Sequence, residues 1–312
     1  MQPCEMQPPP TLPPGASEMR VIEIPRSLDY RNIESLYDQL DPATDGPVLF
    51  DARRLRWIDP NGMLCLLAAG QVAAKGGSAP RISLPNQPEV TGYLDRMGFS
   101  EAARRVFEFG TGSRWRRRPG PSDVLLEVTP VTRNSDVHEV VERVQARAGA
   151  ILSNTLRYPA SAVVQFSVIL SEVCQNIIEH AEGPGWVAAQ AYNWQRRLGR
   201  QVAVIAVADI GRGFCASLED EHAARFGERW GDVTALEAAF LLGLTRFPDT
   251  GRGQGIQQIR KQVARWDGLL SIRSGTARIA DTPGWSSKPP IEEGLRAFPG
   301  AQINIILPES IG

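Results

Sequence analysis

A glycine-rich segment, DTGRGQGIQQI, has glycine at three alternate positions directly before a predicted helix: Gly251, Gly253 and Gly255. Backbone N–H groups without side chains around them can approach an anion closely, and the N-terminal end of the helix adds a positive field. No Gly-Lys-Ser/Thr follows, so this is not a Walker A loop, and it does not belong to an early βαβ unit as a dinucleotide fingerprint would. By itself the pattern is a weak indication of a phosphate site.

A second group with chemical potential ends an apolar strand in VIAVADIGRGF, where Asp209 is followed by Gly211 and Gly213. A carboxylate at a strand end can accept a hydrogen bond from a ligand amino group that lies against bare backbone. The alternative is an ordinary Asp-Gly turn, and one such turn is weak evidence.

A row of polar residues forms the third group, in the segment ILSEVCQNIIEHA. Glu172, Asn176 and His180 follow one another at four-residue spacing, which places all three on one face of a helix. The other faces are apolar and suit packing on a sheet. A buried polar group without a partner costs about 1–3 kcal/mol, so the row needs partners. Taken alone, it favours plain amphipathicity, in which Glu172 and Asn176 only face water.

Alternating strands and helices are predicted to position these groups. Ser135 or Asp136 is placed to cap the first long helix. Hydrophobic periodicity predicts strands at 123–131, 186–194, 201–210, 268–275 and 301–308, helices at 135–153 and 160–180, and a further helix after the glycine loop.

The three groups occur in a recognisable order: Glu-x-x-x-Asn on a helix, Asp-x-Gly-x-Gly after a strand, and GxGxG before a helix. This order resembles the ATP-binding domain of the GHKL (HATPase) superfamily, which includes DNA gyrase and the histidine kinases. EVCQNIIEH is most similar to the anti-sigma-factor serine kinases, whose motif helix has the pattern E-x-x-x-N-x-x-x-H. The resemblance covers about residues 123–308 and implies a Bergerat-type α/β sandwich for residues 123–312.

The resemblance also implies roles for single residues. Asn176 would hold Mg²⁺ through its amide oxygen, and Glu172 would take a proton from the attacking hydroxyl or water. Asp209 would bind the adenine amino group, with Gly211 and Gly213 beside the base. The phosphates of ATP would be held by the glycine loop: Gly251, Arg252, Gly253 and Gly255.

Residues 215–250 correspond to the ATP lid of that family. For His180, a structural hydrogen bond and a chemical role both stay open. His138 is predicted to be a histidine on a helix surface, because its helix belongs to the ATP-binding domain. Arg252 is the better placed candidate for a γ-phosphate contact, but the sequence leaves the choice open among four arginines: Arg225, Arg229, Arg246 and Arg252.

Residues 19–110 also alternate strands and helices and are predicted to form one α/β domain. VLFDARRLRWIDPNGMLCL and YLDRMGF resemble the STAS domain of anti-sigma-factor antagonists, in which a serine after an aspartate accepts phosphate. Here Pro60 follows Asp59 and has no hydroxyl group, so phosphorylation at the usual place is excluded. A docking element that mimics substrate and a dimerisation and sensing module both stay open. The predicted elements are strands at 19–25, 46–55 and 80–85, helices at 27–40 and 61–77, and one or two closing helices within 87–109.

The remaining segments and the composition limit the class of protein. Residues 1–18 are predicted to be a flexible Pro-rich tail, and residues 111–122, which are rich in arginine, a linker rather than a basic binding patch. With 35 acidic and 34 basic residues, no overall field attracts nucleic acid or a membrane. Four scattered cysteines give no zinc or disulfide pattern, so we expect a reduced, cytoplasmic protein.

The resemblance to the anti-sigma-factor serine kinases implies an ATP-binding signalling regulator that transfers phosphate, with Mg²⁺, to a serine or threonine of a separate protein. The resemblance implies a STAS-domain antagonist or a sigma factor as partner, and a homodimer is compatible with it. The alternative is a nucleotide-gated interaction switch or slow ATPase without kinase activity, which Pro60 favours slightly. A scaffold that never binds nucleotide is the third hypothesis.

Overall fold

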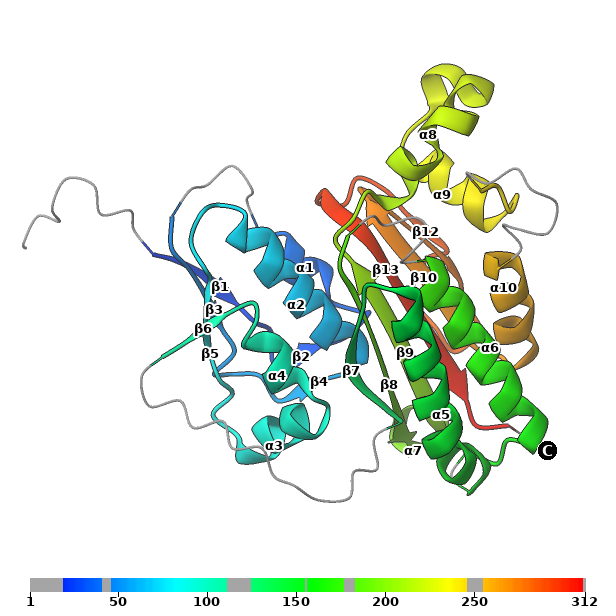
Figure 1. Ribbon diagram of the computed structural model, residues 1–312, viewed down its shortest axis with the longest axis horizontal. Helices are drawn as coiled ribbons and strands as arrows, with labels where there is room; N and C mark the ends of the chain where they lie inside the picture. Colours follow the sequence, from blue (N-terminus) through cyan, green and yellow to red (C-terminus); the bar gives the residue numbers. More distant parts are fainter. Residues whose placement is uncertain are drawn as a thin grey trace, which may run out of the picture.

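Two large sheets and a short two-stranded one, with helices packed on them, make up the protein in the computed structural model, which describes residues 19–40, 46–110, 125–154, 156–176, 183–245 and 255–310. A four-stranded sheet belongs to the N-terminal half and a seven-stranded sheet to the C-terminal half (Figure 1). The predicted α/β class is therefore confirmed in its general form. The STAS-like and Bergerat architectures, and the domain boundaries, stay predictions.

The smaller sheet is parallel, with strand order β1-β3-β5-β6. Its strands are β1 (Arg20–Glu23), β3 (Val48–Asp51), β5 (Arg81–Ser83) and β6 (Glu108–Phe109). A separate parallel pair is formed by β2 (Ser27–Leu28) and β4 (Trp57–Ile58), and the helices of this half are α1 (Glu34–Tyr37), α2 (Pro60–Ala74), α3 (Pro88–Arg96) and α4 (Phe99–Ala103).

The helix predicted over residues 27–40 is wrong for most of its length, because only α1 is α-helical. Asp29 and its neighbours form a turn instead: Asn32 Oδ1 accepts the Asp29 N–H at 3.0 Å, and Asp29 Oδ1 accepts the Arg31 N–H at 3.0 Å. Such side-chain bonds to the backbone compete with the helical hydrogen bonds. The apolar residues that suggested the helix are nevertheless buried: Leu28, Ile33, Leu36 and Leu40.

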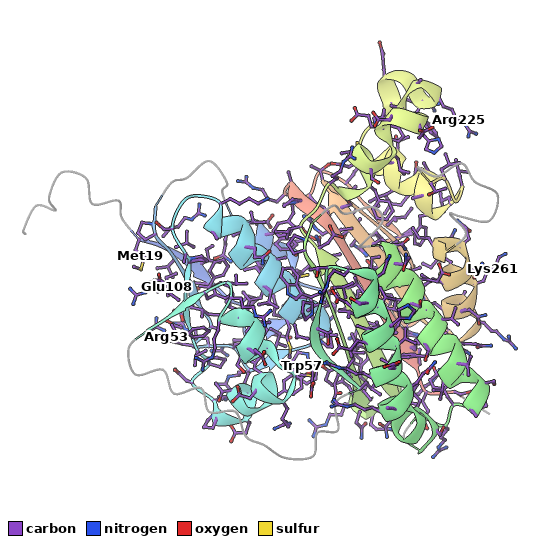
Figure 2. The ribbon with its side chains drawn as sticks, viewed as in Figure 1. Met19, Arg53, Trp57, Glu108, Arg225 and Lys261 are labelled. Atoms are coloured by element: carbon purple, nitrogen blue, oxygen red, sulfur yellow. The ribbon has the colours of Figure 1, made fainter. Side chains whose placement is uncertain are left out.

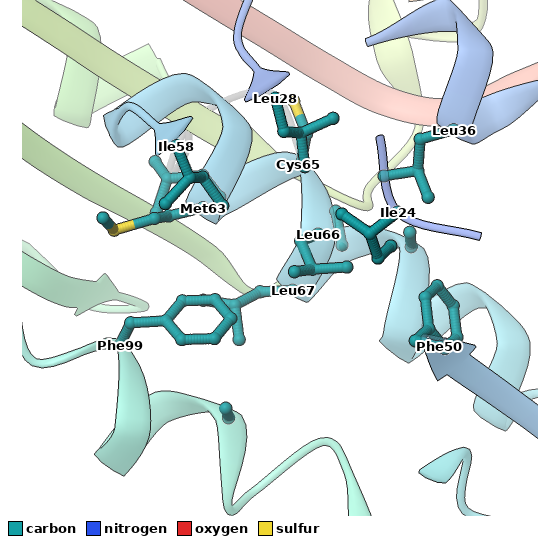
Figure 3. Close-up of a cluster of buried hydrophobic side chains, with 14 of the residues drawn as sticks. Ile24, Leu28, Leu36, Phe50, Ile58, Met63, Cys65, Leu66, Leu67 and Phe99 are labelled. Atoms are coloured by element: carbon teal, nitrogen blue, oxygen red, sulfur yellow. The ribbon is translucent and has the colours of Figure 1, made fainter. Parts of the chain in front are cut away.

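Helix α2 lies between the two sheets (Figure 1). It begins with a capped N-terminus, where Asp59 Oδ1 accepts the Gly62 N–H at 2.8 Å and Pro60 occupies the first helical position. Every residue from 60 to 70 is buried, as expected for a helix that is apolar on all sides. One side of α2 packs with the core of the smaller sheet (Figure 3), and the other packs on β8, β9 and β13.

The larger sheet is antiparallel throughout, with strand order β12-β11-β10-β13-β9-β8-β7. In β9, Ile205 and Val207 face one core, while Ala206 and Ala208 face the core that contains α2. Burial on both sides explains the uninterrupted apolar run of this strand. The strands are β7 (Leu126–Val131), β8 (Gly185–Trp194), β9 (Arg200–Asp209), β10 (Leu269–Gly275), β11 (Ala277–Asp281), β12 (Ile291–Glu292) and β13 (Phe298–Pro308).

Helices α5, α6 and α10 cover the face of this sheet opposite α2 (Figure 1). Ser135 and Asp136 lie inside the first turn of α5 rather than at its N-cap as predicted, because the helix begins at Asn134. Asp136 still satisfies backbone groups at this end, since it reaches back to accept the N–H groups of Thr132 at 2.8 Å and Arg133 at 2.9 Å. No helix in the described part of the chain is long and apolar enough to cross a membrane. The helices of this half are α5 (Asn134–Asn154), α6 (Ala160–Asn176), α7 (Gln195–Leu198), α8 (Gly213–Phe226), α9 (Asp232–Phe240) and α10 (Gly255–Arg265), with a 3-10 turn, η2 (Gly227–Arg229).

Candidate functional site

Three chain segments that carry predicted site residues meet at one end of the larger sheet. The last turn of α6, the first turn of α10 and the end of β9 before α8 all lie at the upper end in Figure 1. Leu170 and Cys174 of α6 share a core with Val207 of β9, so α6 lies on the face toward which Asp209, two residues later, also points.

Glu172 and Gly255 are in direct contact. A Cβ atom at Gly255 would lie 3.5 Å from Cδ of Glu172 and would overlap its Oε2 atom. Position 255 therefore has to be glycine for the carboxylate to sit where it does. The first turn of α10 also brings the positive end of its helix dipole to this carboxylate.

Asn176 is the last described residue of α6, one turn beyond Glu172. Its Nδ2 atom is buried and has no hydrogen-bond partner among the described residues. Because the nitrogen and oxygen of an amide exchange places by rotation, the group can present Oδ1 at this point instead. An amide oxygen without a competing donor suits a hard cation that takes its other ligands from phosphates and water. The described residues contain no cluster of acidic, histidine and cysteine side chains that could hold a metal by itself.

Asp209 is 6% exposed, and its Oδ1 atom accepts the N–H of Gly211 at 2.9 Å. Burial raises the pKa of this carboxyl group to about 6. The backbone approaches closely here, because a Cβ at Gly300 would lie 2.5 Å from Oδ1. The group is thus a buried carboxylate, mostly ionised at neutral pH, within a shell of glycines.

Gly213 has a structural reason to be glycine besides the predicted contact with a base. Its φ of +72° is unfavourable for other residues, and a Cβ would lie 2.7 Å from Ser274 Oγ. Ser274 Oγ in turn accepts the Phe214 N–H at 3.0 Å and donates to the Gly300 carbonyl at 2.8 Å. Ser274 and Gly300 were missed in the sequence, although the Pro-Gly pair at 299–300, next to the start of β13, marks an irregular backbone.

The predicted lid contains α8, η2 and α9. Asp232, at the start of α9, accepts the N–H and the hydroxyl of Thr276, both at 2.8 Å. At the other end, Arg260 of α10 donates to the Phe240 carbonyl at 2.6 Å and pairs with Asp281 at 2.8 Å. Helix α9 is therefore fixed to the sheet and to α10, whereas α8 projects from the body (Figure 1).

Arg225 lies on the projecting α8, well separated from the end of α6 (Figure 2). The structure does not bring it to Glu172. His138 is exposed on α5, as predicted. Several predicted residues lie outside the described ranges: His180, Arg246, Gly251, Arg252 and Gly253. The phosphate-binding role of the glycine loop therefore remains a prediction.

The cysteines of the described ranges are free thiols. Burial raises the pKa values of Cys65 and Cys174 to about 12, so both are protonated and unreactive at neutral pH. Cys215 is half-buried, and burial also raises its pKa. Together with the missing Cys/His spacing, this leaves no thiol suited to chemistry among them.

Pro60 lies on the opposite side of the larger sheet from Glu172. It is buried in the first turn of α2, whereas α6 covers the other face. The position that corresponds to the phosphoacceptor in STAS domains therefore has no access to the candidate site of the same chain. Within one chain, this argues against a docking element that presents position 60 to Glu172.

Compared with models of known protein families and with curated proteins, the chain gives no match.

Proposed function

We propose that this protein binds Mg-ATP and transfers phosphate to a serine or threonine of a separate regulatory protein. One observation carries the proposal: the Glu172 carboxylate lies against Gly255, which joins the polar row of α6 to the glycine loop in space. A carboxylate beside a helix N-terminus that follows a glycine-rich segment is a suitable arrangement for a base next to bound phosphate.

In this proposal Asn176 holds Mg²⁺, with further oxygen ligands from phosphates and water. The side-chain amide at the end of α6, whose Nδ2 atom has no hydrogen-bond partner among the described residues, fits that role. Bound Mg²⁺ supplies neutralisation of the charge that develops on the phosphoryl oxygens. Glu172, beside the first turn of α10, accepts the proton of the attacking hydroxyl.

Asp209 recognises the adenine base. A carboxylate with a pKa of about 6 is mostly ionised at neutral pH and accepts a hydrogen bond from an amino group. Gly211 donates to Oδ1, and the two oxygens of a carboxylate have further lone pairs with which to accept from a ligand. The glycines around Asp209 let the backbone pack closely about the carboxylate, since a Cβ at Gly300 would lie 2.5 Å from its Oδ1 atom.

The acceptor hydroxyl belongs to another protein, because the chain's own STAS-like segment has proline at position 60 and keeps it buried. A STAS-domain antagonist is the first candidate partner, and a sigma factor is a second. The STAS-like half then serves to recruit partners or to control the ATP-binding half.

Calorimetric titration with Mg-ATP, of the wild type and the Asn176→Ala variant side by side, tests the binding step. We expect binding by the wild type and a loss of at least about tenfold in affinity in the variant, since the magnesium ligand is removed. Labelled ATP and candidate STAS proteins test the transfer. Hydrolysis without any phosphoprotein removes the kinase function.

The second candidate is a nucleotide-gated interaction switch, favoured by Pro60, which disables the built-in acceptor. The Glu172→Ala variant distinguishes the two. If it keeps both Mg-ATP binding and biological activity, catalysis is dispensable and the switch is correct. If it keeps binding but loses activity, phosphate transfer is required.

A further inference from the structure

A groove runs between α6 and α10 on the outer surface of the protein, and Glu172 is part of its wall. Its volume is about 400 Å³, within the range of sites that hold small ligands or short peptide segments. The residues that define it are Val164, Val168 and Glu172 on α6 and Gln258, Lys261 and Gln262 on α10.

The α6 wall is an exposed aliphatic stripe that ends at the carboxylate. Val164 is 60% exposed and Val168 is 50% exposed, and they are among the few large apolar side chains at the surface of the described residues. Spacing of four residues places Val164, Val168 and Glu172 in one line along the helix. Two neighbouring exposed valines that lead to a functional carboxylate indicate a contact surface.

The α10 wall is polar and carries a positive charge. Lys261 is exposed (Figure 2), and no carboxylate of the described residues forms an ion pair with it. Gln262 Oε1 is buried and has no hydrogen-bond partner there. An occupant with a carboxylate for Lys261 would complement this wall in charge.

We propose that this groove binds the acceptor segment of the partner protein in an extended conformation, with its serine or threonine hydroxyl at Glu172. The inference rests on the proposed function and specifies the substrate. The occupant has aliphatic side chains two and four positions from the hydroxyl and an acidic residue three positions from it.

These positions follow from the helix and strand repeats. With a rise of 1.5 Å per residue, Val168 and Val164 lie about 6 Å and about 12 Å along α6 from Glu172. An extended chain advances about 3.3 Å per residue, so these distances correspond to two and four residues. Side chains at even positions of an extended chain share one side, which here is the side of α6.

Lys261 determines where the acidic residue of the occupant lies, three positions from the hydroxyl. Gly255 lies beside Glu172, and Lys261 is six residues further along α10, about 9 Å away. That distance corresponds to three extended residues, and the third side chain points to the opposite wall, toward α10. The hydroxyl residue and the side chains two, three and four positions from it can therefore contact both walls of the groove at once.

The experiment selects peptides on the immobilised full-length protein without nucleotide. Each peptide has one fixed serine at its centre, and every other position varies, so both chain directions are sampled. We expect enrichment of Val, Ile or Leu at the second and fourth positions and of Asp or Glu at the third, on one side of the serine. Exposed charge pairs of this kind give an enrichment of about twofold to fivefold.

Two variants and a control make the selection specific. Lys261→Glu should change the preference at the third position from acidic to basic and leave the aliphatic positions unchanged. Val168→Glu should remove the aliphatic preference at the second position. Lys75→Glu, an exposed change beyond the end of α2, should leave the whole pattern unaltered.

A pattern without positional preference, or one that Lys261→Glu leaves acidic, overturns the inference. Enrichment of aliphatic residues four and eight positions from the serine would also overturn the inference, since that spacing is typical of a helical ligand. Titration of the same protein with Mg-ATP tests the proposed function separately. If Mg-ATP binds and no peptide pattern emerges, only the groove assignment fails. If the pattern emerges without Mg-ATP binding, only the nucleotide function fails.

Discussion

Arg273 and Glu34 form a two-pronged ion pair between the two halves of the molecule. Nε of Arg273 lies 2.9 Å from Oε1 of Glu34, and Nη2 lies 3.0 Å from Oε2. The arginine side chain is only 3% exposed, and its guanidinium centre lies 4.7 Å from the centre of the Tyr37 ring. Tyr37 itself stacks on Phe298 of β13, with ring centres 4.0 Å apart. The charge is thus removed from water and compensated by groups of both halves.

Glu34→Ala should destabilise the protein strongly, because it leaves the Arg273 charge buried without its carboxylate. We expect a loss of about 3–5 kcal/mol in the free energy of unfolding, measured by urea denaturation. Glu101→Ala is the matched control, since Glu101 pairs with Arg105 at 3.8 Å on the surface and should change stability by at most about 1 kcal/mol. Equal effects of the two variants would contradict the buried role of Arg273.

Gly255→Ala should weaken Mg-ATP binding and abolish phosphate transfer while the fold is kept. The added methyl group would occupy the place of the Glu172 carboxylate and push it away. Alanine is a better helix residue than glycine, so stability should not fall for reasons of helix propensity. Calorimetry with Mg-ATP and circular dichroism measure the two effects.

Gly92→Ala serves as its control, because the nearest atom to a Cβ there is the end of a flexible arginine side chain, 3.8 Å away in α3. That variant should bind Mg-ATP like the wild type and be stabilised by about 0.5–1 kcal/mol. Unchanged Mg-ATP binding in Gly255→Ala would argue against the contact of Glu172 with this helix.

Asp209 should make stability depend on pH. Burial raises its pKa in the folded protein to about 6, from an ordinary value of 3.8. The folded state therefore holds the proton more tightly than the unfolded state between these values. The free energy of unfolding should fall by up to about 3 kcal/mol as the pH rises through this interval, and change no further above it.

Asp209→Asn should remove this dependence. We expect urea denaturation to show that the free energy of unfolding of the variant, relative to that of the wild type, is higher at about pH 8 than at about pH 4, by up to about 3 kcal/mol. The same variant should lose affinity for Mg-ATP, since the acceptor charge is gone. In the wild type, Mg-ATP affinity should fall as the pH is lowered through about 6. A variant with the wild-type pH profile would refute the assignment of this pKa.

Pro60→Ser should not convert the chain into its own substrate. The new hydroxyl would be buried in the first turn of α2, on the side of the larger sheet away from Glu172. After incubation with Mg-ATP, mass spectrometry should find no phosphate at position 60. An added STAS protein with serine at the corresponding place provides the positive control. Phosphate on the introduced hydroxyl would show that α2 leaves its position between the sheets.

Secondary-structure elements were predicted well from the sequence where the pattern of apolar residues fits only one kind of element. The strand ending at Asp209 and the helix carrying Glu172 follow from uninterrupted apolar runs and from helical spacing. Residues 27–40 were predicted wrongly because apolar residues at helical spacing also fit a chain that turns, and the hydrogen bonds of Asp29 decide between the two. Periodicity reports burial and does not include such local competition.

For the site, sequence spacing predicted Glu172 and Gly255, and their contact required the packing of α6 against α10. Ser274 and Gly300 lie far along the chain from Asp209, so only the pairing of β13 with β9 and β10 brings them together. Long-range strand pairing of this kind leaves little trace in one sequence. The enclosure of α2 was not predicted, although a helix that is apolar on all sides is typical of a buried position.

Because α2 is enclosed by two sheets, few amino-acid substitutions are tolerated in this helix. A substitution there has to fit two surfaces at the same time: a Cβ at Gly70 would come within 2.6 Å of Val106, while the opposite side of the helix packs on β9. Helix α5, by contrast, packs on α6 and β7 from one side and has exposed residues on the other, so fewer of its positions have to fit a neighbour. In a set of orthologous chains, α2 should therefore be the slowest-evolving helix, whatever ligand the protein binds.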